Sequence, residues 1–292
     1  RPVLYGGISS AVTANATAVF VADTNDGLIE YDATTFVKAD SNSASFTNAT
    51  AYDVALSGAN LFVAAGSQGL KIFDGSDINT ARDSIDTDGI AYSVALSSDG
   101  NYAYVADGSE GLYIFDVSDS TDIQLLSHYE ATSFPTSEAR DVTVNGNYAY
   151  ICFNYEGMWI VDVSNPEVPQ VEGSIATSDG VGLYGVSVDT RAQYAYLANG
   201  SDGLKIIDIR TKSNPTLVST FNTPADKAMD VQVSGDYAYV AYGKDGFRVI
   251  NIDDPTSPYE GGYYNTGDVA HGVFLMSGDH SSVYVADSRD GL

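Results

Sequence analysis

The stretch NYAYVADGSEGLYIFDVSD, from Asn101 to Asp119, decides the fold because close variants of it recur along the whole chain. Each variant contains a tyrosine-rich run, a short loop that ends in glycine and a second apolar run. This glycine anchors each copy at spacings of 42, 42, 46, 46, 43 and 45 residues: Gly27, Gly69, Gly111, Gly157, Gly203, Gly246 and Gly291. A constant period of this length indicates a repeat architecture.

Each repeat contains four short segments of the kind that form β-strands. The segments are rich in β-branched and aromatic residues, and Gly, Asn, Asp and Pro separate them. Four antiparallel strands in about 44 residues make up one blade of a β-propeller. The sequence therefore predicts an all-β, seven-bladed β-propeller with four-stranded antiparallel blades and innermost strands near Val12, Val54, Val94, Val142, Val186, Val231 and Val273.

The two ends of the chain indicate how this ring closes. The N-terminal RPVLYGG resembles the outer-strand segment SPYEGGYY of the sixth repeat. We therefore expect Pro2–Gly7 to supply the outer strand of the last blade, which would remove an exposed sheet edge. Residues 1–292 then form a single propeller domain. Because the last copy stops at Leu292, where its third strand begins, we expect the natural chain to continue beyond this residue.

The composition argues against several classes of partner. The net charge is −26, with only 13 Lys and Arg residues. Proteins that bind nucleic acid or anionic lipid need basic residues to contact phosphate, so we expect neither as a partner. Direct membrane insertion is not expected either, because no apolar stretch approaches the ~18 residues of a membrane helix. The single cysteine, Cys152, excludes an internal disulfide framework and lies in an apolar run, which predicts a buried thiol.

Several segments resemble a known repeat family. MWIVDVSNPEVP, LKIIDIRTKSNP and LYIFDVSD resemble the LVIVD-repeat propellers of bacterial and archaeal extracytoplasmic proteins, and SSDGNYAYVAD is similar to the related YVTN-type surface repeat. The resemblance covers nearly the whole chain and implies the propeller fold and a microbial, secreted or cell-surface location. It implies no particular activity, because these repeats occur in proteins with no common chemistry.

One position of the repeat varies where the rest of the repeat is constant. Two residues before the first valine of each inner strand, the seven copies carry Ser10, Tyr52, Tyr92, Arg140, Tyr184, Met229 and His271. In a propeller this position lies near one mouth of the central channel, the usual binding face of the fold. Tyrosine and arginine are favoured at recognition sites. The candidate binding ring is therefore Tyr52, Tyr92, Arg140, Tyr184 and His271, with simple packing between blades as the alternative.

The loops before the anchor glycines are rich in side-chain oxygens. Calcium binds six to eight oxygen ligands, and the loop ADTNDG offers Asp23, Asn25 and Asp26 as candidate ligands. Turn formation is the alternative, because Asp and Asn begin tight turns by bonding their own backbone and glycine then takes the left-handed position. Apart from this calcium site, we expect no cofactor.

These observations favour a non-catalytic binding or assembly module with a protein or glycan partner. Two alternatives remain open, a structural subunit of a surface layer or extracellular filament, and a lactonase-like hydrolase or lyase with a metal in the channel. The three histidines lie in different repeats, and no nucleophile elbow or P-loop occurs. The ring position itself holds no acid, which weakens the enzyme alternative, although Asp53, Asp141 and Asp230 lie one residue further on.

Overall fold

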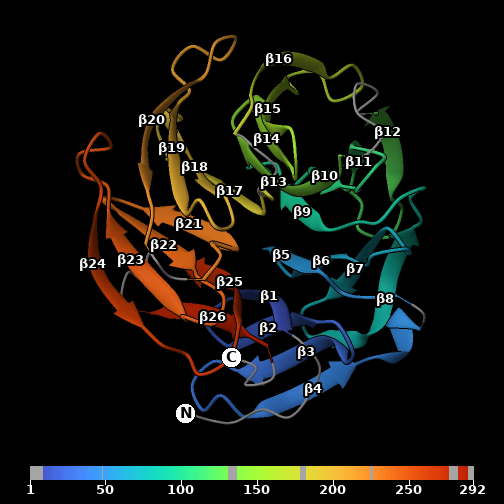
Figure 1. Cartoon of the computed structure of the whole chain (residues 1–292). Helices are drawn as coiled ribbons and strands as arrows, with labels where there is room; N and C mark the ends of the chain where they lie inside the picture. The colour runs from blue at the N-terminus through green and yellow to red at the C-terminus, as the bar shows by residue number, and fades with distance from the viewer. Residues whose placement is uncertain are drawn as a thin grey trace.

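The protein is a ring of small antiparallel sheets around a central channel (Figure 1). The computed structural model describes residues 9–47, 49–130, 137–177, 182–223, 226–275 and 282–288. Within these ranges it contains six four-stranded sheets, one two-stranded sheet and a short 3₁₀ helix, η1 (Ala44–Phe46). No helix in the described ranges is long and apolar enough to cross a membrane.

We number the sheets as blades in chain order. Blade 1 contains β1 (Ser9–Ala14), β2 (Ala18–Asp23), β3 (Gly27–Asp32) and β4 (Lys38–Asn42). Blade 2 contains β5 (Asp53–Ser57), β6 (Asn60–Ala64), β7 (Leu70–Asp74) and β8 (Asp77–Ile85). Blade 3 contains β9 (Ser93–Leu96), β10 (Tyr102–Ala106), β11 (Leu112–Asp116) and β12 (Gln124–Tyr129).

The second half of the chain repeats this order. Blade 4 contains β13 (Ala139–Asn145), β14 (Tyr148–Phe153), β15 (Gly157–Asp162) and β16 (Gln170–Ile175). Blade 5 contains β17 (Gly185–Val188), β18 (Tyr194–Ala198), β19 (Leu204–Asp208) and β20 (Thr216–Phe221). Blade 6 contains β21 (Asp230–Ser234), β22 (Tyr237–Ala241), β23 (Phe247–Asn251) and β24 (Tyr259–Tyr264). The two-stranded sheet consists of β25 (Ala270–Leu275) and β26 (Val283–Asp287).

The first strand of each sheet lies beside the channel, and the following strands lie progressively further out (Figure 1). The inner strands contact one another in a closed cycle, from β1 through β5, β9, β13, β17, β21 and β25 back to β1. Each inner strand contains the valine predicted for it from the repeat. The all-β propeller is therefore confirmed, with six complete blades and the two-stranded sheet in the seventh place. The predicted closing strand, Pro2–Gly7, lies outside the described residues.

The core lies between neighbouring blades, which explains why the middle strands are apolar on both faces. All six residues of β2 are buried, and Phe20 packs in one cluster with Val54 and Phe73 of the next blade. The outer strands are covered on one side only, as the largely exposed β16 shows. Cys152, in the middle strand of blade 4, is fully buried as predicted. Burial raises the pKa of its thiol well above the usual value.

The anchor glycine of the repeat is needed because the outer strand passes directly over it. At Gly69 the backbone φ is +65°, and a Cβ atom would lie 2.3 Å from the carbonyl oxygen of Ile85. At Gly157 the φ is +100°, and a Cβ atom would lie 2.1 Å from the carbonyl oxygen of Ile175. Only glycine adopts this conformation at no steric cost and leaves room for the neighbouring backbone. The seven-fold recurrence of this residue is thus a requirement of the blade.

The recurring aspartate at the end of the third strand begins a turn. Asp74 accepts a hydrogen bond from the backbone N–H of Ser76, and Asp162 accepts the equivalent bond from Ser164. The Ser76 hydroxyl and Arg82 also donate to Asp74, and together these bonds lower its pKa to about 2. These acids hold the turn at the end of the propeller opposite the candidate ring.

Candidate functional site

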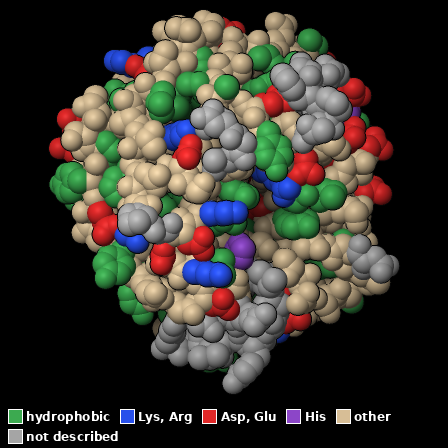
Figure 2. All heavy atoms as spheres, viewed as in Figure 1, with side chains coloured by type: hydrophobic (Ala, Val, Ile, Leu, Met, Phe, Trp, Pro, Cys, Tyr) green, Lys and Arg blue, Asp and Glu red, His purple; other side chains and the backbone are tan. Residues whose placement is uncertain are grey.

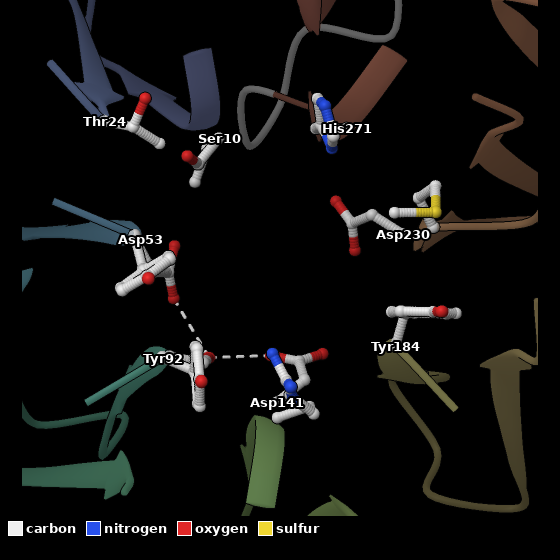
Figure 3. Close-up of a pocket in the computed structure, with 13 residues that line it drawn as sticks. Ser10, Thr24, Asp53, Tyr92, Asp141, Tyr184, Asp230 and His271 are labelled. Atoms are coloured by element: carbon white, nitrogen blue, oxygen red, sulfur yellow. Dashed lines mark hydrogen bonds between the residues drawn. The ribbon is translucent and has the colours of Figure 1, made fainter. Parts of the chain in front are cut away.

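The five candidate ring residues surround one cavity at the mouth of the channel. The cavity has a volume of about 310 Å³, and its lining includes all five of them: Tyr52, Tyr92, Arg140, Tyr184 and His271. Their side chains are half-buried, so each is partly open to the cavity and partly packed against its neighbours. Figure 3 shows several of them pointing toward a common centre, and Figure 2 shows the hollow from outside, between hydrophobic, basic and histidine side chains.

The backbone at four of the seven ring positions is held by a contact between blades, which we call the latch. In the latch between blades 2 and 3, Gly66 and Ala91 exchange two backbone hydrogen bonds, Gly66 N–H to Ala91 O at 3.2 Å and Ala91 N–H to Gly66 O at 3.0 Å. Three further junctions have the same bridge: Gly108 with Ala139, Gly200 with Ala228, and Gly243 with Ala270. The alanine is fully buried and directly precedes the ring residue. Tyr92, Arg140, Met229 and His271 therefore project from a backbone that is bonded to the preceding blade.

The latch glycine also gives the neighbouring tyrosine its place. A Cβ atom on Gly66 would lie 3.2 Å from Cε2 of Tyr52, and a Cβ atom on Gly108 would lie 3.4 Å from Cε2 of Tyr92. Both glycines have φ near +55°, at +53° and +58°, a conformation that L-residues rarely adopt. The glycine thus adopts the left-handed turn, and its lack of a side chain leaves room for the tyrosine ring beside it.

Aromatic and cationic groups contact one another along one wall of the cavity. The ring centroids of Tyr52 and Tyr92 are 4.9 Å apart, at an interplanar angle of 59°. The Arg140 guanidinium lies 4.1 Å from the Tyr92 centroid, within the range of a cation–π contact, and it donates to the Glu138 carboxylate. Burial raises the pKa of Tyr92. Arg140 is thus already paired, on one side with an aromatic face and on the other with an acid.

The opposite side of the cavity is lined by small residues. Blade 1 contributes Ser10, Ala11 and Thr24, where blades 2 to 5 contribute tyrosine or arginine. His271 flanks this side from β25, and burial lowers the pKa of its imidazole, which favours the neutral ring at neutral pH. The cavity is therefore asymmetric, with aromatic rings on one side and the small residues of blade 1 on the other.

Three aspartates also line the cavity, one residue beyond the ring positions (Figure 3). Asp53 accepts hydrogen bonds from the N–H of Val54 in its own strand, at 2.8 Å, and of Val94 in the next blade, at 2.9 Å. Asp141 makes the equivalent bonds to Val142 and Val186, and Asp230 to Val231 and Val273. Each aspartate thus joins its blade to the following one.

The aspartates are also coupled to one another. The Ser93 hydroxyl lies 3.0 Å from an Asp53 oxygen and 2.7 Å from an Asp141 oxygen, between the two carboxylates. Burial, followed by the negative charge of Asp230, raises the pKa of Asp141 to about 8. Burial raises the pKa of Asp230 to about 6, and it raises that of Asp53 as well. The backbone N–H bonds oppose these shifts without cancelling them.

The sequence alone does not reveal the structural role of these aspartates. The N–H groups that they bind in the next blade lie 41, 45 and 43 residues further along the chain. One signal is present in the repeat alignment, where the same position holds Ala11, Ser93, Gly185 and Gly272 in the intervening blades. An acid that alternates with small residues indicates a contact between neighbouring repeats.

The candidate calcium residues form a turn on the rim of blade 1. An Asp23 carboxylate oxygen accepts the backbone N–H groups of Asn25 and Asp26, each at 2.9 Å, and the Asp23 side chain is buried. The Asp26 carboxylate lies 3.9 Å from the Lys38 amine. Within the described ranges, no group of three or more His, Cys, Asp or Glu side chains is placed to hold a metal ion. The geometry of this loop is accounted for by the turn, and calcium binding there stays a prediction.

Comparison with known proteins agrees with this architecture. The model of the LVIVD repeat matches residues 49–78, 88–131, 137–177, 186–223 and 225–266, which is more than half of the chain. The chain belongs to the LVIVD-repeat family. The matched segments of this LVIVD-repeat protein correspond to blades 2 to 6. No curated protein sequence matches the chain significantly.

Solved structures support the fold of the LVIVD-repeat protein. A crystal structure of the computationally designed Ika8 protein superposes with a TM-score of 0.69 at 10% sequence identity, over 98% of this chain and 88% of Ika8. At this level of identity the likeness concerns the fold alone. The comparisons therefore establish the family and the fold of the LVIVD-repeat protein, and its ligand has to be argued from the cavity.

Proposed function

We propose that this LVIVD-repeat propeller is a non-catalytic binding module whose channel-mouth cavity receives part of a protein or glycan partner. One observation carries the proposal. The ring positions differ from blade to blade while the strands that carry them repeat, and these positions converge on a cavity of about 310 Å³. A concave site with aromatic walls and few polar groups is the usual form of a ligand pocket. Rigid aromatic side chains also give contact area at low entropic cost.

The channel acids support binding better than catalysis. A metal-dependent hydrolase requires carboxylates with lone pairs directed at one ion. Here each of Asp53, Asp141 and Asp230 accepts one N–H of its own strand and one of the next blade, and no three such side chains among the described residues are placed around one ion. A melting temperature that rises with calcium and falls with chelator would favour the metal-dependent enzyme instead.

We also propose an extracytoplasmic location, on a microbial surface or in the medium. A net charge of −26 keeps a protein soluble and disfavours self-association. The same charge disfavours assembly into a surface layer or filament unless cations bridge the copies. Fractionation that found the protein only in the cytosol would contradict this location.

We infer further that the two-stranded sheet is the inner half of a seventh four-stranded blade. Its strands β25 and β26 pair antiparallel, as the two inner strands of the other blades do, and β25 lies between β21 and β1 in the cycle of inner strands. Pro2–Gly7 would then pair as the outer strand of this blade. Deletion of residues 1–7 should lower the melting temperature by several degrees, and an unchanged melting temperature would contradict this closure.

The binding proposal is tested with a glycan array and a peptide array. The Tyr92→Ala/Tyr184→Ala double variant should lose about 1–3 kcal/mol of binding free energy to the probes that the natural protein selects, as expected for lost interface anchors. Tyr259→Ala serves as the matched control, because Tyr259 is 59% exposed on the outer strand of blade 6. Equal binding by the double variant and the control would overturn the site assignment.

A further inference from the structure

The charge around the cavity determines what kind of ligand it can hold, provided that it is the binding site proposed above. The basic groups at the mouth each have an acid beside them. Arg140 donates to Glu138, and Lys227 and Lys244 lie near Asp226, whose pKa is lowered by hydrogen bonds from the backbone and by these two charges. These three basic groups are therefore largely neutralised by the two acids beside them, with a net charge of +1 among the five.

The floor of the cavity, in contrast, is acidic without a basic partner. Among the described residues, no Lys, Arg or His side chain lies within ion-pair distance of Asp53, Asp141 or Asp230. Their bonds are to backbone N–H groups and to the Ser93 hydroxyl. These half-buried carboxylates line the cavity without a counter-ion, and partial loss of solvent makes them costly to ionise, which a bound cation would relieve.

The aromatic and apolar side chains above the three aspartates suit an apolar ligand chain that ends in such a cation. Tyr52 and Tyr184 line the cavity with aromatic surface, Tyr92 lies beside them under Arg140, and Met229 adds an adaptable apolar surface. Aromatic faces attract cations, and aliphatic chains pack against them. The acids lie beneath the ring positions, one residue further along each inner strand. A ligand must therefore reach past the tyrosines, which a linear chain does more readily than a bulky ring.

We propose that the cavity binds a protonated primary amine on a linear apolar stem, as on a lysine side chain of a partner protein. The ammonium lies over the aspartate floor, and the methylene groups lie against the tyrosines and Met229. The small side chains of Ser10 and Thr24 line the blade 1 side of the same cavity. The field of a chain with a net charge of −26 favours the approach of such a group.

Arg140 then has a different role from the carboxylate clamp that its residue type suggests. Its guanidinium is paired with Glu138 and covers the face of Tyr92. Arg140 thus fixes the orientation of one wall, and the ring as a whole selects a positively charged ligand.

The pH dependence of amine binding follows from the groups that face the cavity. Asp141 and Asp230 lose their protons as pH rises through about 8 and 6, whereas a lysine amine stays protonated over this range. Amine affinity should therefore increase between pH 5 and 8. The other titratable or charged groups at or beside the site are Asp53, Tyr52, Tyr92, Tyr184, Glu138, Arg140, Cys152 and His271, with Asp268 and Asp287 next to the histidine.

The probes for this proposal are Nα-acetyl-lysine methylamide and Nα-acetyl-norleucine methylamide, which differ only in the ammonium group. NMR titration at pH 7.5 should show saturable binding of the lysine compound and at least tenfold weaker binding of the norleucine compound. Glucosamine tests the other source of a primary amine. If the norleucine compound binds equally, if glucosamine binds more tightly, or if none of the probes binds, the proposal is overturned.

Substitutions then locate the site. Asp230→Asn should weaken lysine-amide binding at least fivefold, whereas Glu172→Gln, the same change of charge on the exposed outer strand of blade 4, should leave it unchanged. If Asp230→Asn unfolds, the rise of affinity with pH in the natural protein gives the same test, and a flat or falling profile contradicts the proposal. If the affinity for array ligands depends on Tyr92 and Tyr184 but not on pH, the cavity is a binding site and the proposed specificity for amines is wrong.

Discussion

Blades 2, 4 and 6 differ from the intervening blades at one inner-strand position. The even blades carry Asp53, Asp141 and Asp230, which bond across to the next blade, and the odd blades carry small residues there: Ala11, Ser93, Gly185 and Gly272. At Gly185 the lack of a side chain leaves room for the aspartate of the next blade. A Cβ atom on Gly185 would lie 3.0 Å from both Cα and Oδ1 of Asp230.

This alternation cannot close evenly around a cycle of seven inner strands. Two small residues, Gly272 and Ala11, therefore meet at the junction between β25 and β1. Here the backbones approach closely, because a Cβ atom on Gly272 would lie 2.8 Å from the carbonyl oxygen of Ser10. The chain thus contains acceptor blades, whose aspartate bonds to the next blade, and spacer blades, which carry a small residue at this position. The junction between β25 and β1 has no such aspartate and relies on other contacts.

The largest effect on stability is expected when an aspartate is placed at this position in a spacer blade. Gly185→Asp puts a second carboxylate against Asp230, in space that the glycine leaves for it. We expect a loss of about 3–5 kcal/mol in the free energy of unfolding, as for an unpaired buried charge. Urea denaturation measures it. Gly262→Asp is the control, since no atom lies within 4 Å of a Cβ atom there. Equal losses in the two variants would show that spacing is not the function of Gly185.

A smaller effect concerns the pH dependence of stability. The pKa of Asp141 is raised to about 8 and that of Asp230 to about 6 in the folded state, above the ordinary value of 3.8. The folded state thus binds the protons more tightly than the unfolded state. Protonation of these two aspartates stabilises the folded state fully below about pH 4. This stabilisation is lost as the pH rises through their folded-state pKa values of about 6 and 8.

The free energy of unfolding should therefore fall by about 2 kcal/mol between pH 5 and 8. The melting temperature should fall over the same range. Asp141→Asn cannot ionise, so it should flatten this slope and cost less stability at pH 8 than at pH 5. Calorimetry of both proteins across the range measures the difference. A variant whose slope equals that of the natural protein would rule out Asp141 as its source.

The smallest expected effect sharpens the comparison within the spacer blades. Ser93 is the spacer whose hydroxyl lies within hydrogen-bond distance of the aspartates on both sides, and its single proton can be donated to one of them at a time. Ser93→Ala should cost about 0.5–1.5 kcal/mol, as expected for one net hydrogen bond. Ser109→Ala, on an exposed loop, should cost nothing measurable in the same denaturation experiment. A neutral Ser93→Ala would mean that the two aspartates are adequately held by the backbone alone.

Much of the fold could be predicted from the sequence because it rests on local, repeated requirements. The anchor glycines, the apolar middle strands and the valines of the inner strands recur at one period, and each requirement is met within a blade. The ring residues could be predicted for the same reason, as the variable position in a constant frame. The bonds of Asp53, Asp141 and Asp230 could not, because their second partners belong to the next repeat and no local pattern records them.

The pairing of Arg140 was also beyond sequence reasoning. The residue type fits a clamp for a ligand carboxylate, but Glu138 lies two residues earlier and the Tyr92 ring approaches from the preceding blade. Which of these contacts satisfies the guanidinium depends on side-chain direction at the junction of two blades. The sequence locates the ring, and the structure determines which of its charges are free to meet a ligand.

The latch has a consequence for how such a chain can grow. Each of the four latches is head-to-tail, with a glycine on the trailing side of one blade and an alanine on the leading side of the next, as in Gly66 with Ala91 and Gly200 with Ala228. One repeat of the chain therefore carries both halves of a joint. A duplicated repeat arrives with its contacts to both neighbours already encoded, so a gene can lengthen by whole blades without inventing a new interface, and selection can act on the ring residues alone.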